Sequence, residues 1–241
     1  MKKIFISLLL ITTIGVSAQK ETYKIADGVI THQDLFNASM VEGVSCFRIP
    51  AIVTAPNGDL IAAIDERVPN CGDLNRSGDI NIVVRRSADN GKTWSGIETV
   101  VNFPLGLSAS DPSMIVDRDT KEIILFYNFM DYEKERDIYY LHVVKSKDNG
   151  KTWSKPEDIT KQIAKPEWHK DFKFITSGRG IQTRDGRLLH TLVNLSKGLF
   201  IFGSDDHGKT WYFIDTPIKP ADESKIIELA DGTWMVNARV N

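Results

Sequence analysis

Short apolar runs alternate with polar turns along most of this chain, and this pattern predicts β-strands joined by hairpins. Runs such as NIVVRR, YYLHVVK and LFIF are rich in the β-branched and aromatic residues that strands favour. Polar turns separate apolar runs at APNGDL (55–60), DRDTKEI (117–123), TRDGRL (183–188) and LADGTW (229–234). Few segments have the 3.6-residue period of a helix, and the best candidate for a helical or loop insertion lies around KQIAKPEWH.

A nine-residue segment recurs three times between these runs. SADNGKTWS (87–95) returns as SKDNGKTWS (146–154) and as GSDDHGKTW (203–211). Their leading serines, Ser87, Ser146 and Ser204, are 59 and 58 residues apart. A fixed period of this length indicates stacked or radially arranged modules. Each module has about four antiparallel strands, which is typical of a β-propeller blade.

The repeated segment is itself predicted to be scaffold, with each copy at a hairpin turn. Its aspartate can accept hydrogen bonds from nearby backbone N–H groups, its glycine allows a positive φ, and its tryptophan can bury a large ring. No copy contains a pair of side chains that could act as nucleophile and base. The three sets are Asp89, Gly91 and Trp94; Asp148, Gly150 and Trp153; and Asp206, Gly208 and Trp211.

The third copy also satisfies the phosphate-loop pattern, as GSDDHGKT (203–210). A phosphate loop opens a helix, whereas the residues that follow, TWYFIDTPIKP, resemble a strand and end in prolines. Two aspartates inside the loop would repel a phosphate. A nucleotide site is therefore not expected.

The N-terminus has the features of a secretory signal. The chain of 241 residues begins with MKK, continues with the apolar run IFISLLLITTIGV, and reaches the small residues of a cleavage site at 16–18. A buried core helix is the alternative interpretation. We expect a signal peptide at 1–18, a lead-in at 19–43, and a propeller, incomplete at its C-terminal side, at 44–241. The protein is then exported to the periplasm, the cell surface or the medium.

Composition narrows the classes of partner. The net charge is −2 and no basic stripe is present, which argues against a nucleic-acid binder. No other apolar stretch approaches the length of a membrane span, so membrane insertion is not expected.

Candidate chemistry gathers at the ends of the first predicted hairpin, CFRIPAIVTAPNGDLIAAIDERVPNCGDL (46–74). Arg48 lies at the start of an apolar strand, although a surface arginine with a packed stem would fit the same pattern. Arg67 and Asp73 are predicted to lie beyond the end of the returning strand, on an irregular loop. Strand ends and loops carry sites more often than strand centres do, so a charged cleft is the hypothesis here.

FRIP (47–50), followed in order by the repeated S-x-D-x-G-x-T-W boxes, resembles the bacterial neuraminidase family of exo-sialidases. The resemblance extends from about Val44 to the C-terminus. It implies a six-bladed propeller, of which this chain covers about three to four blades. It also implies a central pocket for the carboxylate of a terminal sialic acid on a glycan, glycoprotein or glycolipid.

The resemblance also implies roles for individual residues. Arg48 and Arg239 would grip the carboxylate, and Asp73 would be the acid/base. Glu223, in ESKIIELADGTWMVNAR (223–239), would be the catalytic glutamate. Arg67 and Asp111 would line the hydroxyl side of the sugar. Without the resemblance, Glu223 would be interpreted as a solvated carboxylate in a charge-rich loop and Arg239 as a surface charge at a strand end.

The chemistry of such a substrate agrees with these residue types. Guanidinium groups make charge-assisted bidentate bonds to a carboxylate. The same carboxylate would repel an anionic nucleophile, and sialidases use a tyrosine instead, here one activated by a glutamate. The reaction retains the anomeric configuration and needs no cofactor.

The third arginine and the tyrosine of the family lie beyond Arg239 in sequence. All six tyrosines of this chain precede Glu223, at 23, 127, 132, 139, 140 and 212. This chain alone is therefore expected to be inactive. A non-catalytic sialoglycan-binding propeller and a structural propeller with the same boxes remain alternatives, although FRIP, Asp73 and Glu223 argue against the structural one.

The two cysteines, Cys46 and Cys71, each lie two residues before a proposed site residue, Arg48 and Asp73. If those two residues share one pocket, the Cα atoms of the cysteines should lie within about 7 Å. A disulfide and two independent thiols are both open at this point.

Overall fold

The computed structural model of the chain describes residues 20–25 and 28–240, which fall into two units, 1–36 and 37–241. The smaller unit contains an antiparallel hairpin of β1 (Lys20–Ile25) and β2 (Gly28–Gln33). The predicted signal peptide, residues 1–18, lies outside the described residues. Within the described residues, helices are all too short to cross a bilayer.

The larger unit begins with a short 3₁₀ turn, η1 (Ala38–Met40), and then a four-stranded antiparallel sheet. A second 3₁₀ turn, η2 (Leu74–Arg76), lies in the connection after the second strand. The strands of this first sheet are β3 (Cys46–Thr54), β4 (Leu60–Arg67), β5 (Ile80–Ser87) and β6 (Glu98–Val101).

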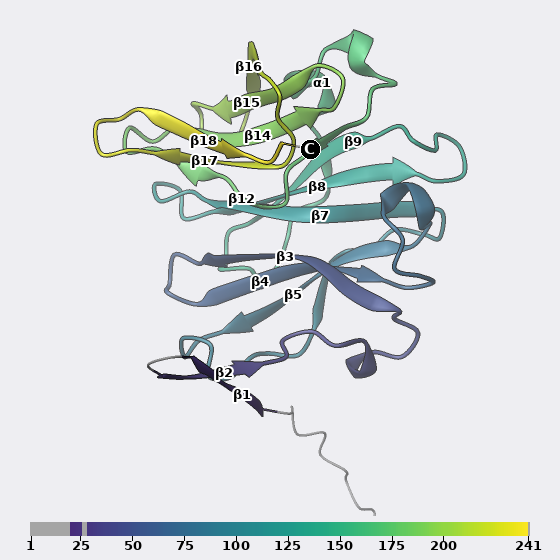
Figure 1. The fold of residues 1–241 in the computed structure, drawn as a ribbon, viewed down its shortest axis with the longest axis vertical. Helices are drawn as coiled ribbons and strands as arrows, with labels where there is room; N and C mark the ends of the chain where they lie inside the picture. The colour runs from purple at the N-terminus through teal and green to yellow at the C-terminus, as the bar shows by residue number, and fades with distance from the viewer. Residues whose placement is uncertain (1–19, 26–27, 241) are drawn as a thin grey trace, which may run out of the picture. The chain divides into compact units, whose positions relative to one another are not determined.

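The second and third sheets repeat this arrangement of adjacent antiparallel strands (Figure 1). The second sheet contains β7 (Leu107–Val116), β8 (Ile123–Asp131), β9 (Tyr140–Ser146) and β10 (Glu157–Asp158). The third contains β11 (Lys173–Ile175), β13 (Ile181–Gln182), β14 (Leu188–Asn194), β15 (Gly198–Ser204) and β16 (Tyr212–Ile218).

The fourth sheet of the larger unit is a hairpin of β17 (Ser224–Glu228) and β18 (Trp234–Ala238). The sheets are not isolated, because β12 (Gly178–Arg179), between β11 and β13, pairs in parallel with β7 of the second sheet. The connection between the second and third sheets holds the short helix α1 (Thr160–Ile163) and the 3₁₀ turn η3 (Pro166–Trp168), where the sequence predicted an insertion. The prediction of a mostly antiparallel β-structure is confirmed.

Each of the three repeated segments lies at the turn between the last two strands of its sheet, a hairpin turn as predicted. In the second copy Asp148 Oδ1 accepts the Thr152 amide at 2.9 Å, and its Oδ2 accepts the Thr152 hydroxyl at 2.6 Å. Ser146 Oγ donates to Asp148 and accepts the Gly150 amide at 2.8 Å. The same bonds recur around Asp89 and Asp206. The third copy leads into a strand, β16, rather than a helix, which agrees with the rejection of a phosphate loop.

The hydrophobic core lies between neighbouring sheets. One cluster joins residues of the first and second sheets, such as Ile61 and Leu125, and a second joins the second and third sheets through residues such as Phe126 and Phe202. Trp211 belongs to the second cluster, and Trp153 packs against the first. The tryptophans of the second and third repeats therefore help to join their own sheet to the preceding one.

The topology places the start of the first strand of a sheet beside the end of its second strand. In the first sheet Cys46 pairs with Arg67, and in the fourth sheet Ser224 pairs with Ala238. Bulges interrupt β3 after Arg48 and β7 after Ser110, where Ile49 and Asp111 adopt φ values of 60° and 61°. Positive φ is costly for such side chains, and outliers of this kind concentrate at functional sites.

Candidate active site

A cavity of about 590 Å³ lies where these strand ends meet, and all four sheets contribute to it. Its volume is in the usual range for a small-molecule site. Five of the six predicted site residues line it, although they are far apart in sequence. They are Arg48, Asp73, Asp111, Glu223 and Arg239.

Arg48 reaches the cavity from the bulged start of β3. Its side chain is 43% exposed, and its Nη1 atom donates to Asp73 Oδ1 at 3.0 Å and to the Cys71 carbonyl at 3.1 Å. This places a guanidinium, positively charged at all ordinary pH values, beside the proposed acid.

Asp73 projects from the loop that follows β4, and its side chain is 68% exposed. Arg67 Nη1 also donates to Asp73 Oδ1, at 2.9 Å. The hydrogen bond from Arg67, with the nearby charge of Arg48, holds the pKa of Asp73 below its usual value of 3.8. In the absence of a ligand the site therefore favours an ionised Asp73.

The position of Arg67 differs from the sequence-based expectation. Its side chain is 1% exposed and does not contribute to the lining of the cavity. Its Nη1 atom donates to the Gly72 carbonyl at 2.6 Å as well as to Asp73, so Arg67 lies behind the loop and supports it. Strand alternation alone does not reveal this, because the loop folds back over the guanidinium.

Cys46 and Cys71 form a disulfide, with Cα atoms 5.7 Å apart. The bond joins the start of β3 to the loop that carries Asp73. Of the two alternatives left open by the sequence, the bridge is confirmed, and it connects the segments that present Arg48 and Asp73 to the cavity.

Asp111 occupies the bulge of β7. Its Oδ2 accepts from Asn128 Nδ2 at 3.1 Å, and its amide donates to Asp65 Oδ1 at 2.9 Å. Burial raises the pKa of Asp111. Asp65, which sequence reasoning missed, is fully buried on β4. Burial, followed by the charge of Asp111, raises its pKa well above 3.8, whereas the charge and hydrogen bonds of Arg67 act in the opposite direction and favour the carboxylate form. The signal for Asp65 was an aspartate inside the apolar strand IAAIDER.

Glu223 and Arg239 lie beside each other at the edge of the fourth sheet, directly before β17 and directly after β18. Arg239 Nη1 donates to Glu223 Oε2 at 2.8 Å, and Nη2 donates to Asp222 Oδ2 at 2.8 Å. The hydrogen bond to Asp222, followed by the charges of Glu223 and Asp222, raises the pKa of Arg239. Asp222 also lines the cavity and was not predicted, because a neighbouring glutamate matched the family pattern better.

Aromatic and aliphatic side chains also line the cavity. Phe172, Phe174 and Leu195 come from the third sheet and its entry, and Tyr139 comes from the start of β9. Burial, with nearby aspartates, raises the pKa of Tyr139, so its phenol stays protonated and is a poor nucleophile.

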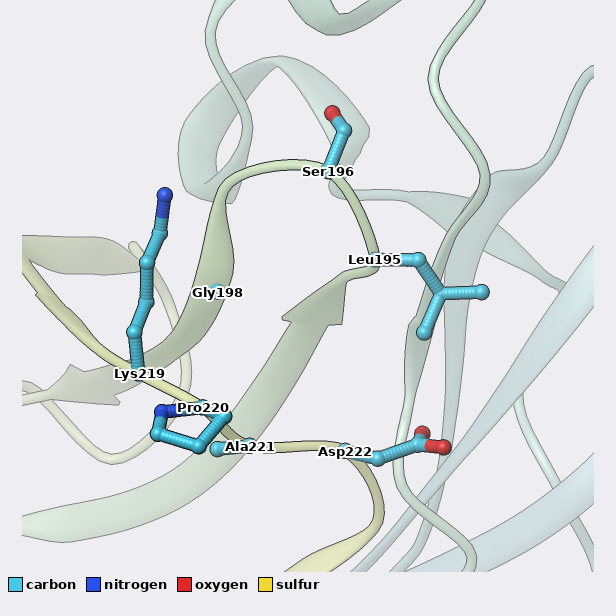
Figure 2. A pocket seen from close by; sticks show the side chains of 7 residues that line it. All are labelled: Leu195, Ser196, Gly198, Lys219, Pro220, Ala221 and Asp222. Atoms are coloured by element: carbon cyan, nitrogen blue, oxygen red, sulfur yellow. The ribbon is translucent and has the colours of Figure 1, made fainter. Parts of the chain in front are cut away.

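A second cavity, of about 500 Å³, adjoins the first (Figure 2). It lies between the β14–β15 turn and the segment that leads to β17, and both cavities share Leu195 and Asp222. In Figure 2 the side chains of Leu195 and Asp222 point the same way, whereas Lys219 points elsewhere. The second cavity lacks the arginine–carboxylate pairs of the first.

Two other clusters among the described residues have ordinary structural explanations. Asp117, Asp119 and His207 have the spacing of metal ligands, but Asp117 already accepts bonds from the Asp119 amide and from His207 Nδ1, at 2.9 and 2.8 Å. Ser113 Oγ lies 2.5 Å from His190 Nε2 inside the core. Because His190 Nδ1 accepts the Thr191 amide, Nε2 carries the proton and cannot activate the serine.

Several known proteins are similar to this chain in sequence. Residues 58–241 match the family described as BNR repeat-like domain. The chain is 34% identical to a sialidase of Micromonospora viridifaciens over 234 residues, covering 87% of this chain and 35% of that protein. It is 29% identical to a sialidase of Bacteroides fragilis, covering 82% of this chain and 40% of that protein. The chain thus spans between a third and a half of the length of these two relatives.

Solved structures show the same fold. The Hadza microbial sialidase Hz136 superposes with a TM-score of 0.72 at 30% identity, covering 81% of this chain and 42% of that one. A leech intramolecular trans-sialidase superposes with a TM-score of 0.75 at 21% identity, covering 94% of this chain and 50% of that one. The predicted fold, a sialidase-type β-propeller of which this chain covers three to four blades, is confirmed. The chain belongs to the family described as BNR repeat-like domain.

Proposed function

We propose that this chain forms the carboxylate-binding and acid/base part of an exo-α-sialidase site, which releases terminal sialic acid from glycoconjugates. The observation that supports this most directly is that Arg48, Asp73, Glu223 and Arg239 line one cavity. Two guanidinium groups from the first and fourth sheets then face a ligand that carries a fixed carboxylate. Export of the protein, proposed from its N-terminal sequence, would bring this site to such glycans outside the cytoplasm.

Binding of the substrate carboxylate is the first step. Arg48 engages its present partners through Nη1, whereas Arg239 uses both Nη1 and Nη2 on Glu223 and Asp222. The carboxylate of the sugar replaces some of these contacts. Each charge-assisted hydrogen bond to it contributes about 1.5–3 kcal/mol.

Asp73 then protonates the glycosidic oxygen as the bond to the leaving group breaks, and later takes a proton from the attacking water. Its low pKa in the free site disfavours the acid form. A substrate carboxylate that draws Arg48 away removes one of the two guanidinium partners of Asp73. Substrate binding therefore shifts Asp73 towards the protonated form that the first step needs.

Glu223 would serve as the base for a tyrosine nucleophile, which gives retention of configuration after two displacements. The family resemblance puts that tyrosine, and a third arginine, after Arg239, whereas the last tyrosine of this sequence is Tyr212. We therefore propose the complete reaction for the whole propeller and carboxylate binding for this chain.

The test is a titration of the chain with 3′-sialyllactose and with lactose, followed by calorimetry or ligand-observed NMR, together with an assay for free sialic acid. We expect binding of sialyllactose but not of lactose, and we expect Arg48→Ala to weaken it. Equal binding of both sugars, or binding that survives Arg48→Ala and Arg239→Ala, would contradict the proposed site. Release of sialic acid by the whole propeller would separate a sialidase from a non-catalytic lectin of the same fold.

A further inference from the structure

The side chain of Asp65 is a fully buried carboxylate that contacts two of the predicted site residues, Arg67 and Asp111, yet it does not line the cavity. Its Oδ2 atom accepts from Arg67 Nη2 at 2.8 Å and from Arg67 Nε at 3.2 Å. Its Oδ1 atom accepts the Asp111 amide at 2.9 Å. A buried ion pair is weak as a source of stability, so its presence needs another explanation.

The contacts of Asp65 determine where Arg67 points. With Nε and Nη2 held by Asp65, the remaining Nη1 donates to the Gly72 carbonyl at 2.6 Å and to Asp73 Oδ1 at 2.9 Å. A continuous chain of charged hydrogen bonds thus runs from Asp65 through Arg67 to Asp73. The other carboxylate partner of Arg67 is Asp73, which is 68% exposed, so loss of Asp65 leaves the buried guanidinium without a buried counter-charge.

Asp65 also joins the first sheet to the second, through its bond with the Asp111 amide. The second sheet has a residue at the equivalent position, Asn128. Asp65 pairs with Arg48, the residue before the bulge of β3, and Asn128 pairs with Ser110, the residue before the bulge of β7. Asn128 joins its own sheet to the third through bonds with the backbone of Ile175, at 2.9 and 3.2 Å. The neutral asparagine is therefore sufficient to join sheets at this position.

Asp65 and Asn128 differ chiefly in the negative charge of the aspartate. At equivalent positions, one sheet carries an asparagine and the other an aspartate, and only the aspartate faces an arginine that supports the proposed acid. We propose that Asp65 is a positioning residue whose negative charge orients Arg67 and, through it, Asp73. This inference rests on the proposed function for the role of Asp73 in the reaction, but the geometry it predicts can be measured without turnover.

The variant Asp65→Asn tests it, because it introduces the residue that the second sheet uses. Asparagine has one acceptor oxygen, so it cannot serve both the Asp111 amide and the Arg67 guanidinium. The readout is the titration of the Asp73 carboxyl, followed by carbon-detected NMR. We expect its midpoint to rise by about one pH unit in Asp65→Asn, since Asp73 loses a well-placed cationic partner.

Asp117→Asn is the matched control. Asp117 is also a fully buried aspartate that bonds to the next sheet, through His207, but it lies six residues beyond Asp111 along the chain, about 20 Å away in extended backbone. Both variants should lower the melting temperature. Only Asp65→Asn should move the titration of Asp73, and an unchanged Asp73 midpoint in a folded Asp65→Asn protein would overturn the proposal.

A second variant keeps the proposal testable if Asp65→Asn does not fold. Arg67→Gln removes the middle of the chain of bonds, and it should raise the Asp73 midpoint by at least as much. If Arg67→Gln leaves that midpoint in place, the proposal is wrong. If the midpoint moves as expected while no sialic acid is bound or released, the proposed function fails and the positioning role of Asp65 stands.

Discussion

The Nη1 atom of Arg67 lies 2.9 Å from Asp73 Oδ1, and it joins a guanidinium that is 1% exposed to a carboxylate that is 68% exposed. The contact connects the interior of the first sheet to the open cavity. Arg48 Nη1 donates to the same oxygen at 3.0 Å. Asp73 is therefore held by two cations, one fixed in the core and one free to respond to a ligand.

Asp73→Asn should reduce turnover by the whole propeller most for substrates with poor leaving groups. General acid catalysis contributes about 10²–10⁴-fold, and a good leaving group needs little of it. We expect a loss in this range for sialyllactose and a much smaller loss for an aryl sialoside, measured as kcat/KM. Asp79→Asn, which changes an aspartate of the same connection outside the cavity lining, should leave both rates unchanged. Equal losses on the two substrates in Asp73→Asn would remove Asp73 from the acid role.

Arg48→Ala should weaken binding of sialyllactose by about 10- to 100-fold, which corresponds to the loss of one charge-assisted interaction. Arg48→Lys should fall between the wild type and Arg48→Ala, because lysine keeps the charge without the planar fork. Calorimetric titration of the chain measures both. Arg184→Ala is the control, since Arg184 bonds to Glu228 and the Ala230 carbonyl, away from the cavity lining. Its binding constant should match that of the wild type.

Replacement of both cysteines by alanine should lower the free energy of unfolding by about 3 kcal/mol. The bridge closes a loop between residues 25 apart in sequence, and its loss restores the freedom of the unfolded chain. Urea denaturation of the oxidised wild type and of Cys46→Ala/Cys71→Ala measures the difference. A reducing agent should destabilise the wild type and leave the double variant unaffected. A double variant as stable as the oxidised wild type would contradict this prediction.

Acid should weaken the repeated turns in a defined interval of pH. Hydrogen bonds from Thr152 lower the pKa of Asp148 from 3.8 to about 2. Since the folded-state pKa is depressed, the stabilisation is fully present above pH 3.8 and is lost as the pH falls towards 2. Asp148→Ala should therefore cost about 1–2 kcal/mol at neutral pH and progressively less below pH 3.8.

Denaturant unfolding of the wild type and of Asp148→Ala at pH 7, 4 and 2.5 measures how the difference between their free energies of unfolding changes with pH. Lys151→Ala changes an exposed side chain of the same repeat and keeps the amide that donates to Asp148, so its difference from the wild type should lack this decline between pH 3.8 and 2. A cost of Asp148→Ala that stays constant down to pH 2.5 would show that the ionised carboxylate is not what holds the turn.

Much of the fold could be predicted from sequence because its determinants are local. The boxes at 87–95, 146–154 and 203–211 place an aspartate, a glycine and a tryptophan at fixed offsets, and each set closes a turn within nine residues. Alternating apolar runs define the strands on either side. The residue types of the site were also visible, because Arg48 and Asp73 stand at strand ends where an apolar pattern stops.

The arrangement of the site was decided by tertiary structure. Nothing within a few residues of Arg67 shows that its guanidinium lies behind Asp73, because that depends on a loop that folds back over it. Asp65 Oδ1 accepts the Asp111 amide only because the second sheet brings that amide to it, across 46 residues of sequence. Local hydrogen bonds and strand periodicity act over a few residues and can be read along the chain, whereas contacts between sheets depend on how complete sheets pack.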